Sequence, residues 1–406
     1  METRLTPEFA ASAEGREAEA ILRACVHCGF CTATCPTYQL LGDELDGPRG
    51  RIYQIKQVLE GAEPTRSTQL HLDRCLTCRS CETTCPSGVT YGRLLDIGRR
   101  VVDERVPRPA GERVKRALLR EGVTSPLFGP AMRAGRALRA LVPEGLRDKL
   151  GEPQDPGVWP SREHARKVIL PLGCAQPAMA PNIDAATARV LDAIGVQALV
   201  PGGGCCGALR QHSGDHSGAQ RDMRRNIDAW WPHVERGEVE AIVVNASGCG
   251  VMVKDYGREL AGDPAYADKA RRVAELARDP VEFLAEQSEA LRQRLRKRPA
   301  ERLAWHPPCT LQHGQRLGGR VEALMRELGF ELALPEQSHL CCGSAGTYSV
   351  LQPELSHQLR DNKLERLRQL QPERVLSANI GCISHLQAGT STPVQHWLEF
   401  LDQAMA

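Results

Sequence analysis

Eight of the sixteen cysteines in this chain fall into two copies of one spacing pattern near its beginning. Each copy reads CxxCxxCxxxCP, as CVHCGFCTATCP from Cys25 and as CLTCRSCETTCP from Cys75. Thiolates are soft ligands that suit zinc or iron–sulfur clusters. A structural zinc site closes with four ligands and has no use for a final cysteine followed by proline, repeated twice. The pattern therefore predicts two four-iron, four-sulfur (4Fe-4S) cubes rather than zinc.

The same spacing predicts which cysteines share a cube. Three cysteines at intervals of three reach three corners from one tight loop, but a fourth so close in sequence would strain it, so the fourth ligand comes from the other motif. The two predicted ligand sets are Cys25, Cys28, Cys31 and Cys85, and Cys75, Cys78, Cys81 and Cys35. A helical pattern at residues 47–62 lies between the motifs and predicts the α-helical kind of dicluster ferredoxin domain.

Charge and composition exclude several classes of partner. The 52 basic and 50 acidic residues nearly cancel, which argues against nucleic acid binding and against a polybasic membrane anchor. The first twenty residues are charged and lack the apolar core of a signal peptide, so a reducing cytoplasm is expected. No apolar run approaches the roughly 18 residues of a membrane-spanning helix, so any membrane contact is expected to be peripheral.

The second half of the chain is an internal duplication around eight further cysteines. Each copy has a single cysteine, then an adjacent pair after 31 or 32 residues, then a last cysteine after 43 or 40 more. The two sets are Cys174, Cys205, Cys206 and Cys249, and Cys309, Cys341, Cys342 and Cys382. Short apolar runs precede these cysteines and helical patterns follow, which predicts parallel α/β sheets with the cysteines at the carboxyl ends of strands. Three loops would then bring four thiols together in each copy.

These patterns predict an α plus α/β architecture in four segments. They are an α-helical dicluster ferredoxin domain at 1–107, a helical connector at 108–165, and two Rossmann-like cysteine-rich α/β domains at 166–298 and 299–406. The connector is rich in proline and arginine. We expect it to pack loosely, with solvated arginines and no chemistry.

The eight downstream thiols favour metal or cluster ligation over structural or dithiol redox roles. Adjacent cysteines cannot share one corner of a cube, so each pair contacts two irons or supplies a single ligand. The third residue after the last cysteine is Met252 in the first copy and His385 in the second. Met252 is expected to pack in the core. His385 is a candidate second-shell group or proton donor, with a surface role as the alternative.

Two further signals are weak. Residues 202–207 contain a literal GxGxxG, the dinucleotide-binding fingerprint, but the second copy keeps the cysteines and drops the first two glycines. No other stretch offers a flavin or nicotinamide site, so substrate oxidation is expected on another polypeptide. Four histidines near the cysteines are expected to be structural or exposed and to have no catalytic role, namely His27, His212, His306 and His313.

A dicluster ferredoxin domain followed by two CCG repeats resembles the iron–sulfur proteins related to heterodisulfide reductase. Within that group the strings WHPPCTLQHGQ, CCGSAGTYSV, NIGCISHLQ and CVHCGFCTATCPTYQLLGDELDGPRGRIYQIKQVLEG are similar to the iron–sulfur subunits of bacterial glycolate oxidases. The resemblance implies a glycolate dehydrogenase complex in which two homologous FAD-binding partner subunits oxidise glycolate or D-lactate. The iron–sulfur subunit then carries electrons to a quinone or another acceptor that is not oxygen.

The type of cluster in the repeats and the substrate of the complex stay open. In the heterodisulfide reductase relatives, full CCG repeats with a terminal CxxC hold noncubane clusters; Met252 and His385 depart from that ending, which argues against such clusters here. An ordinary third cluster in the second repeat is compatible with the sequence, and so is a disulfide reductase site at Cys341 and Cys342. A subunit that serves a glycerol 3-phosphate or L-lactate dehydrogenase, and a non-catalytic scaffold, would fit the same motifs.

Overall fold

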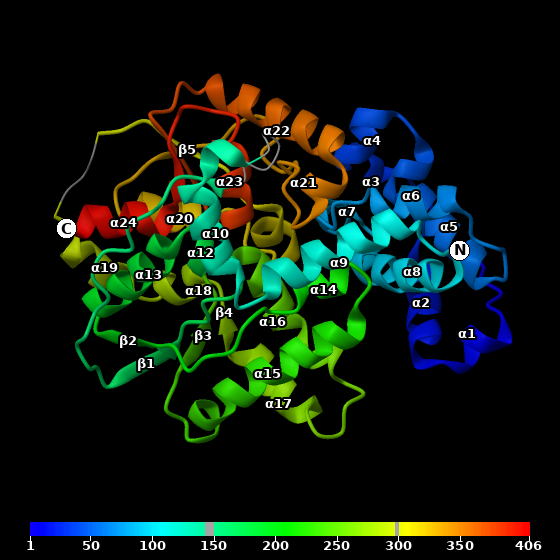
Figure 1. Ribbon diagram of the computed structural model, residues 1–406, viewed down its shortest axis with the longest axis horizontal. Coiled ribbons are helices and arrows are strands. Elements are labelled where there is room, and N and C mark those ends of the chain that lie inside the picture. Colours follow the sequence, from blue (N-terminus) through cyan, green and yellow to red (C-terminus); the bar gives the residue numbers. More distant parts are fainter. Residues whose placement is uncertain (143–149, 297–299) are drawn as a thin grey trace.

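The computed structural model describes residues 1–142, 150–296 and 300–406 of the chain. A helical N-terminal body lies at one end of the molecule, and two α/β bodies lie side by side at the other (Figure 1). The predicted boundary between residues 298 and 299 falls outside the described residues. No helix in the described ranges is long and apolar enough to cross a bilayer.

The N-terminal body is built from short helices around the two cysteine motifs. They are α1 (Pro7–Ala11), α2 (Ala13–Ala24), α3 (Phe30–Ala33), α4 (Pro36–Leu41), η1 (Glu44–Asp46), α5 (Pro48–Leu59), α6 (Arg66–Asp73), α7 (Ser80–Thr84) and α8 (Tyr91–Arg105). The predicted helix between the motifs is confirmed as α5. Its periodic apolar residues Ile52, Ile55, Val58 and Leu59 are all buried against α2 and α8.

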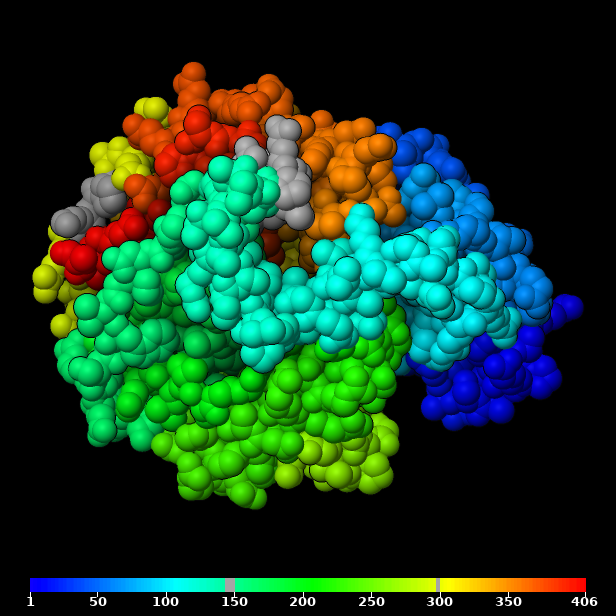
Figure 2. Space-filling view, in the orientation of Figure 1, coloured from blue at the N-terminus to red at the C-terminus, as the bar shows by residue number. Residues whose placement is uncertain are grey.

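The connector contains α9 (Ala110–Thr124), α10 (Phe128–Ala137) and η2 (Arg139–Leu141). Figure 2 shows it lying across the front of the molecule, from the N-terminal body over the α/β bodies. The prediction that its arginines are solvated is wrong for several of them. Arg108 and Arg116 are 9% and 15% exposed and both pair with Asp73 of α6, and Arg136 donates to main-chain carbonyls beyond the connector. These arginines bind the connector to the N-terminal body and to the first repeat.

Each repeat contains a four-stranded parallel sheet with the same strand order. The first sheet runs β2-β1-β3-β4 and the second β6-β5-β7-β8, so the predicted duplication is confirmed. The strands are β1 (Arg166–Ile169), β2 (Val196–Leu199), β3 (Ala241–Val243), β4 (Ala277–Arg278), β5 (Leu303–Trp305), β6 (Leu332–Ala333), β7 (Arg374–Ser377) and β8 (Val394–His396).

Helices connect the strands and cover the sheets, as the alternating patterns predict. The first repeat has α12 (Gln176–Met179), α13 (Pro181–Ala193), α14 (Ala208–His212), α15 (His216–Glu235), α16 (Ser247–Glu259), α17 (Ala267–Leu276), α18 (Pro280–Ala285) and α19 (Ser288–Arg294). The second has a π-helical turn η3 (Thr310–Gly314), then α20 (Arg320–Glu327), α21 (Tyr348–Leu351), α22 (Pro353–Arg368), α23 (Ile380–Gln387) and α24 (Trp397–Met405).

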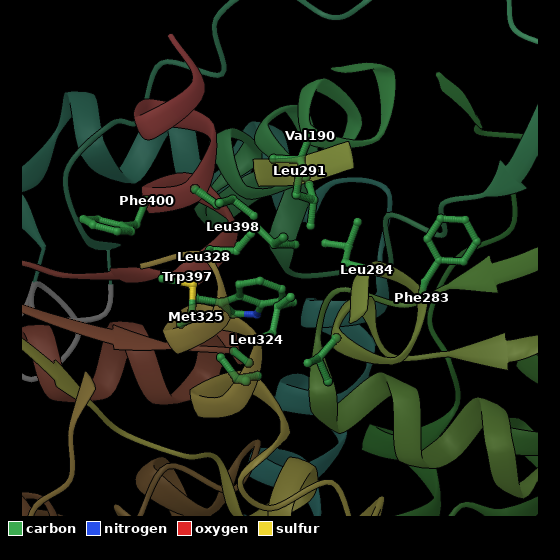
Figure 3. Packing of buried hydrophobic residues seen from close by; sticks show 14 of the residues in the cluster. Val190, Phe283, Leu284, Leu291, Leu324, Met325, Leu328, Trp397, Leu398 and Phe400 are labelled. Atoms are coloured by element: carbon green, nitrogen blue, oxygen red, sulfur yellow. The ribbon is translucent and has the colours of Figure 1, made fainter. Parts of the chain in front are cut away.

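The two repeats share one hydrophobic core. Val190 and Leu291 from the first repeat lie in the same buried cluster as Leu324 and Trp397 from the second (Figure 3). Helices α13 and α24 pack against each other across this boundary. Because the apolar faces of the two sheets are buried together, the repeats hold their cysteine loops at fixed relative positions.

Candidate iron–sulfur sites

The two N-terminal motifs form loops of the same conformation. His27 and Gly29 of the first have positive φ angles of 57° and 86°, and Thr77 and Arg79, at the matching positions of the second, have 53° and 58°. A side chain other than glycine in the left-handed region costs roughly 1–3 kcal/mol and persists only where the surroundings enforce it. The repeated turns therefore set where the cysteine side chains point.

The first predicted ligand set lines one pocket. Cys25, Cys28, Cys31 and Cys85 surround it, together with Pro86, the residue that follows the last cysteine. Burial, with the neighbouring Cys25 thiol, raises the pKa of Cys31 to about 11. Protonated thiols do not bind iron, so a positively charged metal centre is needed to hold this group of sulfurs in the thiolate form.

The second predicted set lines an adjacent pocket, which contains Cys35, Cys75, Cys78 and Cys81. Cys81, Pro48 and Tyr91 line both pockets, so the two share a wall. Eight cysteines around two neighbouring cavities, with Cys81 in the shared wall, are a donor set that fits two 4Fe-4S cubes. The assignment of each ligand stays a prediction.

A buried arginine supports the second pocket. Arg51 is fully buried and lines the pocket, and its guanidinium donates to the carbonyl of His71 and to Thr37. Asp46 accepts from Arg51 and Arg74 and also contacts His71, so these partners already occupy the carboxylate of Asp46. The fixed positive charge of Arg51 stabilises thiolates beside it.

The second repeat brings its four cysteines together as expected. Cys309 Sγ lies 3.9 Å from Cys341 Sγ, and Cys342 and Cys382 are also hydrogen-bonded neighbours. Cys309 precedes the π-helical turn η3, and Cys382 is the third residue of α23. A ring nitrogen of the buried His306 lies within 4.8 Å of both Cys342 Sγ and Cys382 Sγ.

The first repeat also gathers its four thiols. Cys174 and Cys206 both donate to Cys205, and the backbone nitrogen of Gly207 donates to the same sulfur at 3.4 Å, so these hydrogen bonds lower the pKa of Cys205. Cys206 also hydrogen-bonds Cys249, near the start of α16. In the described residues, the interactions of these thiols stay within their own repeat.

Steric constraints explain why a glycine follows the cysteine pair in each CCG sequence. Gly207 and Gly343 have φ angles of 95° and 88°, a region that other residues rarely adopt. A Cβ atom would lie 3.1 Å from the carbonyl oxygen of Ala219 at the first position and 2.5 Å from that of Ser356 at the second. The glycine therefore lets the cysteine pair lie close to α15 in the first repeat and to α22 in the second.

The second repeat packs directly on the second N-terminal pocket. Leu76, Cys341 and Tyr348 belong to one buried cluster, and Cys78 and Cys309 pack against it. The Tyr348 hydroxyl donates to the carbonyl of Arg74 at 3.1 Å. The three groups of sulfurs are thus arranged in the order first pocket, second pocket, second repeat.

The histidines singled out in the sequence differ in their contacts with the cysteine loops. His313 hydrogen-bonds Thr83 at 2.8 Å and so joins the second repeat to α7, while His212 pairs with Asp96 and His27 lies edge-on to Tyr53. His385 contacts Ser356, whose hydroxyl donates to the Gly343 carbonyl. This indirect link to the cysteine loop is compatible with the second-shell role, which stays a prediction.

Two groups beside the second-repeat cysteines were given no chemical role from the sequence: Lys363 was not singled out, and His306 was expected to be structural or exposed. Lys363 is buried, donates to the carbonyls of Gln337 and Ser338, and has its pKa lowered by burial to about 8. His306 is buried too, and burial lowers its pKa. Its position at the end of a predicted strand, three residues before Cys309, was the available signal.

The GxGxxG segment has a structural explanation. Gly202 and Gly203 take positive φ angles, and Asn226 binds both the N–H of Gly204 and the carbonyl of Cys205. Trp230 donates to the Gly202 carbonyl. The glycines thus form the turn that carries Cys205.

Comparisons with known proteins match this architecture. The family described as 4Fe-4S dicluster domain matches residues 21–89, and the cysteine-rich CCG domain family matches residues 168–254 and 303–387. The chain is 54% identical to the glycolate oxidase iron-sulfur subunit of Escherichia coli (strain K12), over 100% of this chain and 99% of that protein. The probable glycolate oxidase iron-sulfur subunit of Bacillus subtilis (strain 168) is 29% identical, with 91% and 89% covered. Lactate utilization protein A of Geobacillus thermodenitrificans (strain NG80-2) is 27% identical over 58% of this chain and 98% of that protein.

Proposed function

The chain belongs to the family of glycolate oxidase iron–sulfur subunits, and on this premise we propose that it is the electron-transfer subunit of a glycolate (D-lactate) dehydrogenase complex. The observation that carries the proposal is that each predicted ligand set lines one of two adjacent pockets, with Cys81 of the second set in the wall that the pockets share. Cys25, Cys28, Cys31 and Cys85 would hold one cluster, and Cys35, Cys75, Cys78 and Cys81 the other. Bound clusters of this type supply transfer of single electrons.

The protein itself contributes position, burial and charge. The left-handed turns at His27 and Thr77 orient the sulfurs, and the shared wall keeps the two ligand sets adjacent. Arg51 supplies a buried positive charge beside the second set. We extend the series to an additional cluster site on the second repeat, because its cysteines pack against Cys78 and Leu76.

We place the flavin partners at the first pocket. Cys28 is exposed there, and the neighbouring Val26 and Phe30 side chains are 67% and 61% exposed. An apolar surface around an exposed ligand loop suits a partner that must exclude water from the contact. The proposed partners are two homologous FAD-binding subunits that oxidise the substrate.

The proposal also covers the electron acceptor and the cellular location. Electrons leave to a quinone or another acceptor that is not oxygen, at the inner face of the cytoplasmic membrane in the case of a quinone. None of the sixteen cysteines forms a disulfide bond, which supports our proposal of a reducing cytoplasm. We further propose that the domains divide after residues 107, 165 and 298.

The test uses the anaerobically purified complex. We expect the chain to hold about eight irons from two cubes, with more if the second repeat is loaded. Replacing Cys25 or Cys75 with serine should abolish glycolate-dependent reduction of the acceptor while the partner flavin is still reduced. Cys174→Ser, which lies outside both ligand sets, is the matched control and should keep both cube signals. Zinc in place of iron, or loss of flavin reduction in the Cys25 and Cys75 variants, would contradict the proposal.

The second candidate is a lactate dehydrogenase complex, because a relative that matches 58% of this chain is named lactate utilization protein A, and we include L-lactate because that name gives no enantiomer. The same complex assayed with glycolate, D-lactate and L-lactate separates the candidates. Flavin reduction by L-lactate alone would assign the chain to an L-lactate dehydrogenase.

A further inference from the structure

Imidazole nitrogen is present among the thiols of the second repeat. A ring nitrogen of His306 and the sulfurs of Cys342 and Cys382 lie within 4.8 Å of one another, and all three residues are buried. Ligands around one tetrahedral metal atom at bond lengths of 2.0–2.3 Å are about 3.5–3.8 Å apart, so three such atoms need only small adjustments to share a metal.

In the described part of the chain, the ring nitrogens of His306 make no hydrogen bond. Its side chain is 1% exposed, and neither Nδ1 nor Nε2 has a hydrogen-bond partner. Buried polar atoms are almost always hydrogen-bonded, because an unsatisfied one loses its hydration without compensation. The other buried histidines named above, His313 and His385, instead bond Thr83 and Ser356.

The main chain fixes where the imidazole can lie. His306 follows β5 directly, its N–H donates to the carbonyl of Leu376 at 2.9 Å, and its own carbonyl accepts from Ser377 at 2.9 Å. Pro307 and Pro308 come next and restrict the backbone before Cys309. Because the main chain is held on both sides of His306, the imidazole extends from a fixed position beside the cysteine loops.

We propose that His306 ligates iron in the same centre as Cys342 and Cys382, so that the second-repeat site has mixed nitrogen and thiolate ligation. This inference rests on the proposed cluster site in that repeat and deepens it. The residue three positions before Cys174 in the first repeat is Pro171, which has no ligand atom. The two repeats are therefore chemically different although they share one plan.

Nitrogen ligation has a consequence for electron flow. Iron–sulfur centres in which histidines replace cysteines have higher reduction potentials, because neutral imidazole leaves the centre less negative than thiolate does. The second repeat lies beyond the second pocket in the series of sulfur groups. A raised potential there would draw electrons away from the flavin side.

The experiment is pulsed EPR on the anaerobically purified complex at graded reduction, with natural-abundance or 15N-labelled histidine. The wild type is expected to show a third iron signal, coupled to a nitrogen that responds to the label. His306→Cys should keep the iron, lose the coupling and lower the potential of that signal. His306→Ala should lose the extra iron, with an affinity drop of at least the roughly 10–100-fold that loss of a supporting partner causes. His313→Ala and His385→Ala are the controls and should keep the coupling.

The outcomes separate the two proposals. A wild-type complex with only the iron of two cubes refutes the additional site, while leaving the two N-terminal clusters. A third signal without nitrogen coupling, or a coupling that survives His306→Cys or disappears in His385→Ala, overturns the role of His306 alone. Zinc bound in place of the extra iron overturns the iron assignment.

Discussion

Gly343→Ala should be unusually damaging for so small a change. Gly343 has a φ angle of 88°, and an added Cβ would lie 2.5 Å from the carbonyl oxygen of Ser356, which belongs to the backbone of α22. A backbone atom cannot move away cheaply, unlike the end of a flexible side chain. The loop that carries Cys342 must then shift, or α22 must.

The magnitude follows from two costs. The left-handed conformation costs a non-glycine residue about 1–2 kcal/mol. Overpacking adds typically about 1–3 kcal/mol. Gly346 is the matched control in the same loop, since its φ angle is 61° and its nearest contact for a Cβ is 3.8 Å away. Gly346→Ala has only the first cost, and Gly207→Ala, with a backbone oxygen at 3.1 Å, should fall between the two.

Thermal unfolding of the three variants in the anaerobic complex measures this order. A difference of about 1–3 kcal/mol between Gly343→Ala and Gly346→Ala corresponds to about 2–12 °C in melting temperature for a unit of 150–250 residues. Gly343→Ala should also lose any iron held by the second repeat before the N-terminal cubes are affected. Equal melting temperatures for Gly343→Ala and Gly346→Ala would refute the steric reasoning.

Three further predictions concern buried polar groups. Burial raises the pKa of Asp184 from 3.8 to about 7, so this carboxyl contributes stability below pH 4 that is lost as pH rises to about 7. Asp184→Asn should remove this loss of stability, so the variant should unfold with a free energy about 2–4 kcal/mol higher than wild type at pH 8. Urea unfolding at pH 5 and pH 8 measures the difference, and a pH dependence equal to that of wild type would contradict the prediction. Tyr348→Phe removes the hydrogen bond to Arg74 and should lower the unfolding free energy by about 0.5–1.5 kcal/mol, whereas no change would mean that this bond does not help dock the second repeat. Lys363→Met removes a buried positive charge beside the second-repeat thiols. The reduction potential of a centre bound by these thiols should fall by roughly 40 mV for each 1 kcal/mol of lost attraction. A redox titration measures this potential, and an unchanged value would contradict the prediction.

The parts of the fold that follow from local patterns could be predicted. The spacing of the N-terminal cysteines anticipated two groups of four, since the length of each loop limits which sulfurs can meet. Apolar runs before Cys174 and Cys309 anticipated β1 and β5, and the period of Ile52 and Ile55 anticipated α5. These features depend on residues close together in sequence.

Elements defined by tertiary contacts could not be predicted in the same way. The fourth strands, β4 and β8, have two and three residues and no cysteine follows them, so their pattern is indistinguishable from a loop. The connector arginines were expected in solvent, yet Arg108 and Arg116 meet Asp73, a residue more than thirty positions away. Neither composition nor periodicity contains that information.

The unequal roles of the repeats arise at the same tertiary level. Both repeats gather four thiols behind a CCG turn, and the sequence separated them only by single residues such as Met252 and His385. The second repeat meets the N-terminal body through buried contacts of Cys341 and Tyr348 with Leu76, whereas the first meets it through charged pairs such as Arg79 with Asp255. A dry, close contact suits electron transfer between neighbouring sites, and a charged contact suits alignment. The second repeat therefore lies next to the second pocket, and the first repeat supports the second through the core that they share.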